Sequence, residues 1–363
     1  ENPEYSDEIR PLVPAFHYVP DELVPFFMRD MPTFIADRYV DGGVVAVAPI
    51  TNDMREDILV HAQDKVSFFR IARERVNAAV GLANSMGAVD FGYGATLPGV
   101  MNWGKATKNT EVTTTTGHGG TTALMDMIID EAIEHVMPEK RDTLRIGVLG
   151  LGRIGLSATQ VVAQLHPGAQ FNVFDPVERN VDQLVASHDD PERYTRRQNE
   201  KDVIENSDII LSTATTTFNL TDPDKPNYID IKSLEGKVII DDSEPHSFIP
   251  EEVIKLGGMV LDVIGRDWSG KILQRETDFG YGHTLADGRR DAFGCELEAR
   301  MLRKLREDLA PLPREIIDKT IGEYALRGPV TAANTMMWIN LFRHYGIGPA
   351  PLQAFGKEYE LPA

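Results

Sequence analysis

The feature that most constrains this chain is a short, largely apolar run that ends in three spaced glycines. Residues 145–149 lead directly into Gly150-x-Gly152-x-x-Gly155, a pattern that predicts a strand, a tight turn and the start of a helix. Gly150 allows the turn, Gly152 lets the backbone approach a pyrophosphate, and Gly155 lets the helix pack closely on the strand. The free N–H groups of such a helix start attract phosphates. The pattern predicts a dinucleotide site; its alternative is a glycine-rich structural turn in an α/β sheet.

An acidic residue supports the dinucleotide interpretation. A second apolar run, residues 171–174, ends in Asp175, 20 residues after Gly155, where a carboxylate accepts both ribose hydroxyls. Asp175 would repel a 2′-phosphate, so NAD(H) is favoured over NADP(H), although Arg179 is close enough in sequence to approach such a phosphate. The residues expected to contact the cofactor are Gly150, Gly152, Arg153, Ile154, Gly155, Asp175, Arg179, Thr213, Ala214 and Thr215.

Strands and helices alternate through the middle of the chain. Buried strands are predicted at residues 209–213, 238–242 and 259–262, and apolar strands that alternate with helices indicate a parallel sheet covered on both faces. We expect an α/β fold, with a Rossmann-type doubly wound parallel sheet plus a second α/β catalytic domain. A chain of 363 residues suits more than one domain. The expected division is residues 1–137 for an N-terminal substrate or catalytic domain, 138–290 for the NAD(P)-binding domain, and 291–363 for C-terminal helices that pack back on the N-terminal domain.

Signals outside the sheet are more local. Residues 1–32 are rich in proline and acid and are expected to be irregular surface chain. A hairpin is predicted where residues 33–40 and 44–50 flank Asp41-Gly42-Gly43. Helical spacing of apolar residues predicts helices over 64–86, 121–135, 291–309, 313–326 and 331–345, with a glycine-rich loop over 92–99.

Composition excludes several classes of protein. The formal net charge of −19 argues against nucleic acid as a partner. No apolar stretch approaches the ~18 residues of a membrane span. The single cysteine, Cys295, excludes an internal disulfide and a cysteine-based zinc cluster, and it fits a reducing cytoplasm. We expect a cytoplasmic protein without a bound metal, and the oligomeric state stays open, a homo-oligomer included.

Cys295 lies near the start of the predicted helix 291–309. A thiol in the first helical turn feels the helix dipole, which stabilises the thiolate, and Arg289 and Arg290 just upstream add positive charge. The alternative is a small core residue, the usual role of a single buried cysteine.

Several motifs, taken in order, resemble the cyanobacterial long-chain acyl-ACP reductases, and the chain looks like a distant relative of that family over roughly residues 33–350. Each motif is weak alone, but their order and the coincidence at the only cysteine carry the resemblance. The matching stretches are the helix 64–86 leading into Gly87-Ala88-Val89-Asp90, the loop Gly92–Gly99, Thr115-Thr116-Gly117, the glycine turn Gly150–Gly155, Arg290-Asp291-Ala292-Phe293-Gly294-Cys295, and Arg343-His344-Tyr345-Gly346.

The resemblance implies a reaction. In that family a cysteine on a helix after the nucleotide domain takes a fatty acyl group from a thioester, and a nicotinamide cofactor reduces the acyl group to an aldehyde. Cys295 occupies the matching place. The expected function is therefore an NAD(P)H-dependent reductase of an acyl thioester, with acyl-carrier protein or acyl-CoA as donor.

Three features depart from the family. The family has Tyr-Pro-Lys where this chain has Glu244-Pro245-His246, so a lysine role is not inherited. The family favours NADPH, whereas Asp175 favours NADH. The acidic surface would repel an acidic carrier protein, so docking would need a basic strip such as Arg300, Arg303, Lys304 and Arg306, or Arg196 with Arg197.

Other candidate residues come from loops. His118 lies between glycines ahead of a predicted helix, and His246 follows the carboxyl end of a predicted strand; each is a candidate for proton handling or substrate binding. His283 is a further candidate because it is close to Cys295 in sequence. Asp241-Asp242 could bind a metal, but two adjacent acids on a strand point opposite ways, so a capping role is favoured.

Two alternatives to thioester reduction stay open. One is a shikimate- or amino-acid-type NAD(P)-dependent dehydrogenase that uses the same two-domain plan without covalent catalysis. It would need a Lys–Asp pair or a similar acid/base set, which the sequence does not identify. The other is a regulator that binds dinucleotide and turns nothing over.

Overall fold

The computed structural model describes most of the chain and divides it into two compact units. The described residues are 33–39, 42–47, 65–85, 88–94, 97–109, 111–214, 216–243, 246–270, 291–325, 330–354 and 357–359. The first unit comprises Glu1–Gly117 and Arg266–Gly328, and the second comprises His118–Gly265 and Pro329–Ala363. The expected irregular segment 1–32, Thr215 and His283 lie outside the described residues.

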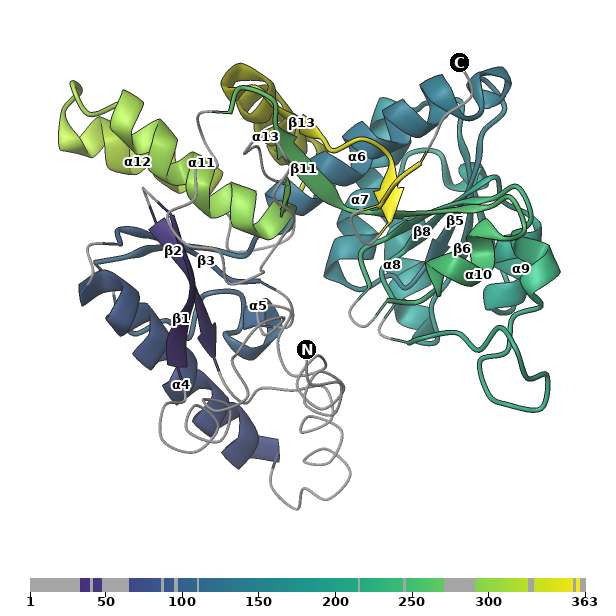
Figure 1. Ribbon diagram of the computed structural model, residues 1–363, viewed down its shortest axis with the longest axis horizontal. Helices are drawn as coiled ribbons and strands as arrows, with labels where there is room; N and C mark the ends of the chain where they lie inside the picture. Colours follow the sequence, from purple (N-terminus) through teal and green to yellow (C-terminus); the bar gives the residue numbers. More distant parts are fainter. Residues whose placement is uncertain are drawn as a thin grey trace. The chain divides into compact units, whose positions relative to one another are not determined.

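The second unit contains the predicted parallel sheet (Figure 1). Its six strands lie in the order β10-β9-β8-β5-β6-β7, and every neighbouring pair is parallel. This is the doubly wound order 3-2-1-4-5-6 read from the other edge, so the Rossmann-type fold is confirmed. The strands are β5 (Arg145–Leu149), β6 (Gln170–Phe174), β7 (Tyr194–Arg196), β8 (Ile209–Ser212), β9 (Val238–Asp241) and β10 (Met259–Asp262).

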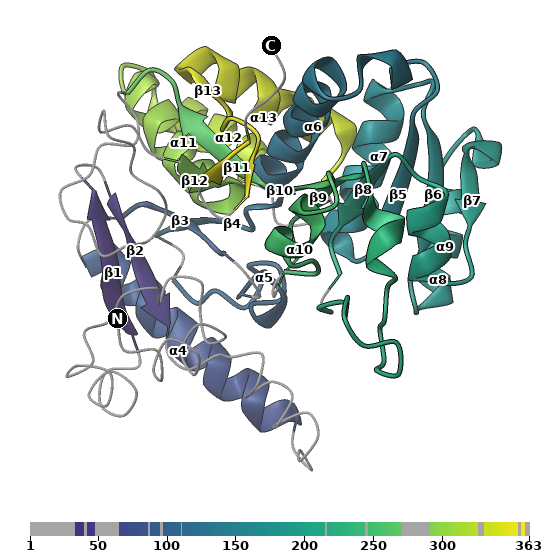
Figure 2. The same ribbon diagram turned by 45° about the vertical axis from the view of Figure 1, so that its right-hand side comes forward.

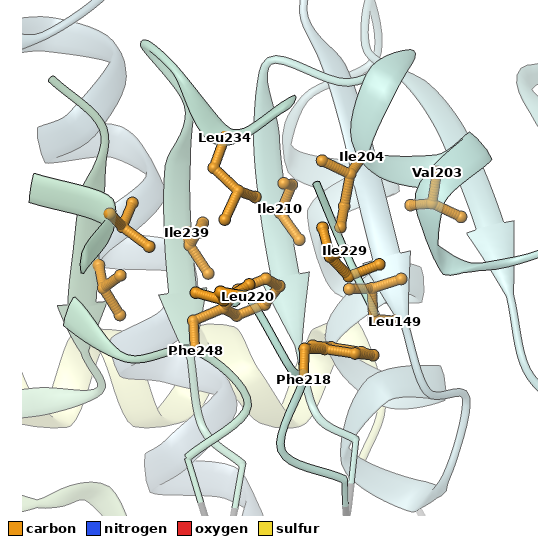
Figure 3. Packing of buried hydrophobic residues seen from close by; sticks show 12 residues of the cluster. Leu149, Val203, Ile204, Ile210, Phe218, Leu220, Ile229, Leu234, Ile239 and Phe248 are labelled. Atoms are coloured by element: carbon orange, nitrogen blue, oxygen red, sulfur yellow. The ribbon is translucent and has the colours of Figure 1, made fainter. Parts of the chain in front are cut away.

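The sheet is buried on both faces, as its unbroken apolar strands predict. Every residue of β8 and β9 is buried. On one face, side chains of β5, β8, β9 and β10 pack with α9 (Glu200–Glu205), α10 (Pro250–Ile254) and the segment 218–234 (Figure 3). Phe218 and Phe248 meet there with ring centroids 5.0 Å apart.

Helix α6 (His118–His135) belongs to this second unit, where it packs against α7 (Arg153–Leu165) and α13 (Ala332–Tyr345). It begins three residues before the predicted start at residue 121. The units therefore divide the chain differently from the expected boundary at 137/138. The physical reason is that α6 is buried along most of its length, so it needs neighbours on several sides.

The first unit is built around a hairpin, a long helix and a short parallel strand pair (Figure 2). Strands β1 (Thr33–Tyr39) and β2 (Gly42–Val47) form the predicted antiparallel hairpin, but Gly42 and Gly43, expected in the turn, belong to the second strand, with Tyr39 opposite Gly42. Helix α4 (Lys65–Ser85) contacts both. Strands β3 (Asp90–Gly92) and β4 (Thr113–Thr115) pair in parallel, and their core includes Val76, Val80, Tyr93, Met101 and Val112.

The helix that carries Cys295 starts later than the sequence predicts. Residues Asp291–Phe293 form strand β12, and helix α11 runs over Gly294–Asp308. The expected start at Asp291 is wrong because the Asp291 carboxylate is bound to Arg266 through hydrogen bonds of 2.7 and 3.0 Å, with both side chains buried. In the sequence, Asp291 looks like an acidic residue of a first helical turn. In the structure it forms a long-range ion pair with Arg266.

The remaining elements complete the chain. They are α5 (Leu97–Val100), η2 (Pro138–Lys140), α8 (Glu178–Ala186), η3 (Pro191–Arg193), η4 (Ile231–Leu234), β11 (Ile264–Asp267), α12 (Arg314–Tyr324), β13 (Ile347–Pro349), β14 (Gln353–Ala354) and β15 (Lys357–Glu358). Within the described part of the chain, no helix combines the length and apolarity that crossing a bilayer requires.

Two helical glycines give a test of this packing. A Cβ on Gly155 of α7 would collide with the Gly150 carbonyl oxygen and the Thr213 hydroxyl. We expect Gly155→Ala to lower the free energy of unfolding by about 1–3 kcal/mol, because a fixed backbone atom must move. Gly81→Ala on α4, where a Cβ meets nothing within 4 Å, should raise it by about 0.5–1 kcal/mol. Urea denaturation measures both; equal effects would contradict the packing described.

Candidate functional site

The glycine turn after β5 has the geometry that its sequence predicts. Gly150 has a positive φ of 88°, and a Cβ there would lie 3.0 Å from the carbonyl oxygen of Thr213. The Thr213 hydroxyl donates to the Gly150 carbonyl at 2.8 Å. Thr213 follows β8 and Gly150 follows β5, so the contact lies where the strand order reverses, the place at which such sheets bind ligands.

Gly152 has a different environment from the other two glycines. It is the N-cap of α7, and a Cβ there would meet no atom within 4 Å. The backbone is thus open on this side, ahead of a helix start whose N–H groups favour an anion. Arg153, exposed, is the first helical residue, and Ile154 beside it is half-buried. These residues fit the pyrophosphate of a dinucleotide.

Asp175 organises the same turn. One carboxylate oxygen accepts from the Leu151 N–H at 2.6 Å and the other accepts from the Val177 N–H at 2.7 Å. Each oxygen keeps a further lone pair for a ribose hydroxyl. Arg179 is exposed on α8. The preference for NAD(H) stays a prediction that rests on Asp175.

In the first unit, three glycines surround Cys295. Gly117 has a positive φ of 76°, and a Cβ there would overlap the Cys295 Cβ and lie 2.7 Å from its Cα. A Cβ on Gly92 would lie 3.0 Å from the Cys295 carbonyl oxygen, and one on Gly94 would lie 3.4 Å from the sulfur. Cys295, half-buried, is the second residue of α11. The glycine-rich loop, the Thr-Thr-Gly segment and the only cysteine therefore meet in one place.

Long-range pairs hold α11 in this environment, and the sequence does not reveal them. Arg306 donates to both oxygens of Asp90 at 3.0 and 3.1 Å, which ties the end of α11 to β3. The hydroxyl of Thr115 on β4 donates to the carboxylate of Glu298 on α11, and both side chains are fully buried. No sequence signal marks these pairs, because Thr115 lies in a run of four threonines and Glu298 and Arg306 lie in a strongly charged helix.

His118 and His246 have different environments. His118 is the first residue of α6 and is buried; burial, together with the nearby Arg153 charge, lowers its pKa to about 4. The Nδ1 of half-exposed His246 lies 3.8 Å from a carboxylate oxygen of Asp241. That oxygen and its partner accept the N–H groups of Ser243, Ser247 and Phe248, so Asp241 caps its loop.

The basic residues considered for carrier docking already face carboxylates of this chain. On α11, Arg303 pairs with Glu307 and Lys304 with Asp308. The remaining pairs are Arg300 with Glu296, Arg306 with Asp90 and Asp318, Arg196 with Asp182, and Arg197 with Asp202. Neither strip therefore offers uncompensated charge to an acidic partner.

Comparisons with known proteins give distant likenesses of fold. No protein-family model matches the chain, and no curated protein matches it. Among solved structures, shikimate dehydrogenase from Aquifex aeolicus is 17% identical over 39% of this chain and 49% of that chain, with a TM-score of 0.28. Dipicolinate synthase A chain from Bacillus subtilis is 15% identical over 60% and 64%, with a TM-score of 0.30.

A third likeness is the NAD complex of D-isomer specific 2-hydroxyacid dehydrogenase from Lactobacillus delbrueckii ssp. bulgaricus. It is 17% identical over 42% of this chain and 52% of that chain, with a TM-score of 0.27. The match thus spans about half the length of the shikimate and 2-hydroxyacid dehydrogenases. Similarity at this level assigns no activity.

The open face of Gly152 gives a direct test of the dinucleotide site. Gly152→Val should abolish binding of NAD(H) and NADP(H), because the new side chain would occupy the space of the pyrophosphate. The melting temperature should change little, since no protein atom lies within 4 Å of that Cβ. Fluorescence titration measures binding. Unchanged affinity in the variant would contradict the site.

Burial of His118 predicts a pH dependence of stability. Its folded pKa of about 4 is below the ordinary 6.5, so the unfolded chain binds more protons between these values, and the free energy of unfolding falls as pH drops below about 6.5. The contribution lost by pH 4 is at most on the order of 3 kcal/mol. His118→Gln should flatten this decline in urea denaturation. If the free energy of unfolding changes with pH in the same way in wild type and in His118→Gln, the lowered pKa of His118 is contradicted.

Proposed function

We propose that the protein is a nicotinamide-dependent oxidoreductase that reduces an acyl thioester to an aldehyde through an acyl-enzyme on Cys295. The observation that supports the proposal most is the packing of Gly117, Gly94 and Gly92 around this residue. These glycines come from two segments that resemble motifs of the acyl-ACP reductases, and the chain has no other thiol. Gly117 and Gly92 bring the backbone too close to Cys295 for a Cβ to fit easily, and Gly94 lies at ordinary contact distance from the sulfur.

The chemistry of the first step follows from the thiol. The Cys295 sulfur attacks the carbonyl carbon of the substrate, the bond to the carrier sulfur breaks, and the thiol proton leaves with the departing carrier thiol. The cysteine is at the start of α11, where the first N–H groups of the helix have no intrahelical acceptor and can stabilise the developing oxyanion. Gly94 leaves room beside the sulfur.

The second step needs a reductant of the class that the glycine turn fits. When bound, the reduced nicotinamide supplies a hydride to the carbonyl carbon of the Cys295 thioester, and one proton is taken up. The bond from the carbon to the Cys295 sulfur then breaks, which releases the aldehyde and restores the thiol. Gly150, Gly152, Gly155 and Asp175 are the residues that would hold this cofactor, with Arg153 next to its phosphates.

We propose that the enzyme recognises the thioester group of its substrate and that no particular carrier is specified. The basic strips of α11 and of residues 196–197 are neutralised by neighbouring carboxylates, so they give no reason to prefer an acidic carrier protein to an acyl-CoA. Acyl chain length is likewise open.

Mass spectrometry tests the covalent step. Protein incubated with an acyl-CoA in the absence of reduced cofactor should gain the acyl mass on the peptide that contains Cys295. Cys295→Ser should lose this adduct and nearly all aldehyde formation, because a serine hydroxyl has no comparable anion at neutral pH. Binding of NAD(H) should survive, since the glycine turn lies in the other unit.

The control is Gly152→Val, which should still acquire the acyl mass but form no aldehyde. Full reductase activity in Cys295→Ala would contradict the covalent mechanism and favour the dehydrogenase alternative. Dinucleotide binding with no product from any thioester, aldehyde, hydroxy acid or amino acid would favour the regulatory alternative.

A further inference from the structure

The hydrogen bond between Thr115 and Glu298 joins the two segments that meet at Cys295. The Thr115 hydroxyl donates to a Glu298 carboxylate oxygen, and both side chains are fully buried. Glu298 is three residues after Cys295 on α11, so the two share one side of the helix. The hydrogen bond therefore joins β4 to α11 close to the first turn of the helix, which contains the Cys295 thiol.

On the strand side, Thr115 is two residues before Gly117, which makes the closest of these glycine contacts with Cys295. Thr115 is the last residue of β4, and its carbonyl accepts the Tyr93 N–H at 3.0 Å. Gly117 follows after Thr116 and packs against Cys295. Fixing Thr115 to α11 thus fixes the short segment whose other end touches Cys295.

Other contacts already anchor α11 as a whole. Arg306 binds Asp90 of β3 near the end of the helix. The strand before the helix is held by the buried pair of Asp291 and Arg266. These pairs act at the two ends of the helix, and the Thr115–Glu298 bond acts between them, close to Cys295 in the first turn.

The neighbouring threonines provide an internal comparison. Thr114 and Thr116 are as buried as Thr115, but their hydroxyls have no hydrogen-bond partner among the described residues. A buried hydroxyl without a partner is replaced by a methyl group at little cost, whereas Thr115→Val removes a hydrogen bond that a buried carboxylate accepts. Of these three threonines, Thr115 is the one that the contacts single out.

We propose that Thr115 and Glu298 are positioning residues for Cys295, and that their hydrogen bond aligns the thiol for attack on the acyl carbonyl. This inference rests on the proposed function. It assigns the pair no contact with the substrate: the bond acts by keeping the Thr115–Gly117 segment against the first turn of α11.

Single-turnover acylation of Cys295 by an acyl-CoA, followed by rapid quench and mass spectrometry, tests the pair. Thr115→Val and Glu298→Ala should each slow acylation by about ten- to a hundredfold, the scale of a small misplacement of reacting groups. The double variant should be no slower than Glu298→Ala alone, because that substitution already removes the bond that Thr115→Val removes. Thr115→Ser and Glu298→Gln keep a donor and an acceptor, so both should stay within about threefold of wild type.

Two matched controls separate alignment from stability. Thr114→Val changes the adjacent buried threonine and should leave acylation unchanged. Val112→Ala removes core volume from the same unit, so it should lower the free energy of unfolding without slowing acylation at temperatures where the protein is folded. Wild-type acylation in Thr115→Val, multiplying losses in the double variant, or a Glu298→Gln variant as slow as Glu298→Ala would each overturn the inference.

A reagent that needs no acyl substrate distinguishes failure of the inference from failure of the proposed function. Iodoacetamide can alkylate only Cys295 among cysteines, and release of the segment should speed alkylation at least threefold in Thr115→Val but not in Thr115→Ser. If wild type gains no acyl mass while this pattern holds, the proposed function fails, and what survives is that the Thr115–Glu298 bond holds the segment against Cys295. If wild type is acylated while alkylation is identical in all variants, the positioning role fails alone.

Discussion

The first unit depends on one close approach between backbones, that of Gly117 to Cys295. Two constraints act together at Gly117, because its φ is positive and its missing Cβ would overlap the cysteine. A side chain there is excluded by strain and by volume at once. The end of β4 can therefore lie directly against the first turn of the cysteine helix. Gly92, at the end of the paired strand β3, approaches the same helix.

The second unit uses the same principle for another purpose. Gly150 and Gly155 bring the end of β5, the start of α7 and Thr213 into contact, while Gly152 leaves its side of the turn open. Within this one motif, Gly150 and Gly155 allow close packing, whereas Gly152 keeps one side of the turn open. Asp175 connects the turn to β6 through the Leu151 N–H. The acid that the sequence predicts to bind a ribose is thus also part of the framework that shapes the turn.

The parts of the molecule that follow from the sequence are those set by short-range patterns. The three glycines, the alternating strands and the hairpin each depend on residues within a few positions of one another. The start of α11 could not be found in this way, because Asp291 binds Arg266, 25 residues earlier. The same holds for Thr115 with Glu298, which are 183 residues apart. The placement of α6 depends on the helices that pack against it, α7 and α13. The apolar residues of α6 show that it is buried, but they do not show which elements bury it.

If the acyl group passes through Cys295, the adduct on this residue can be followed in time during a single turnover. A single turnover with an acyl-CoA and NADH deuterated at the transferring position would be quenched at intervals, and both the Cys295 peptide and the aldehyde would be analysed by mass. We expect the adduct to rise before the aldehyde and to decay at the rate at which the aldehyde appears, and we expect the aldehyde to carry one deuterium from the NADH. Deuterated aldehyde formed before any adduct, or an adduct that outlasts product formation, would contradict this expectation.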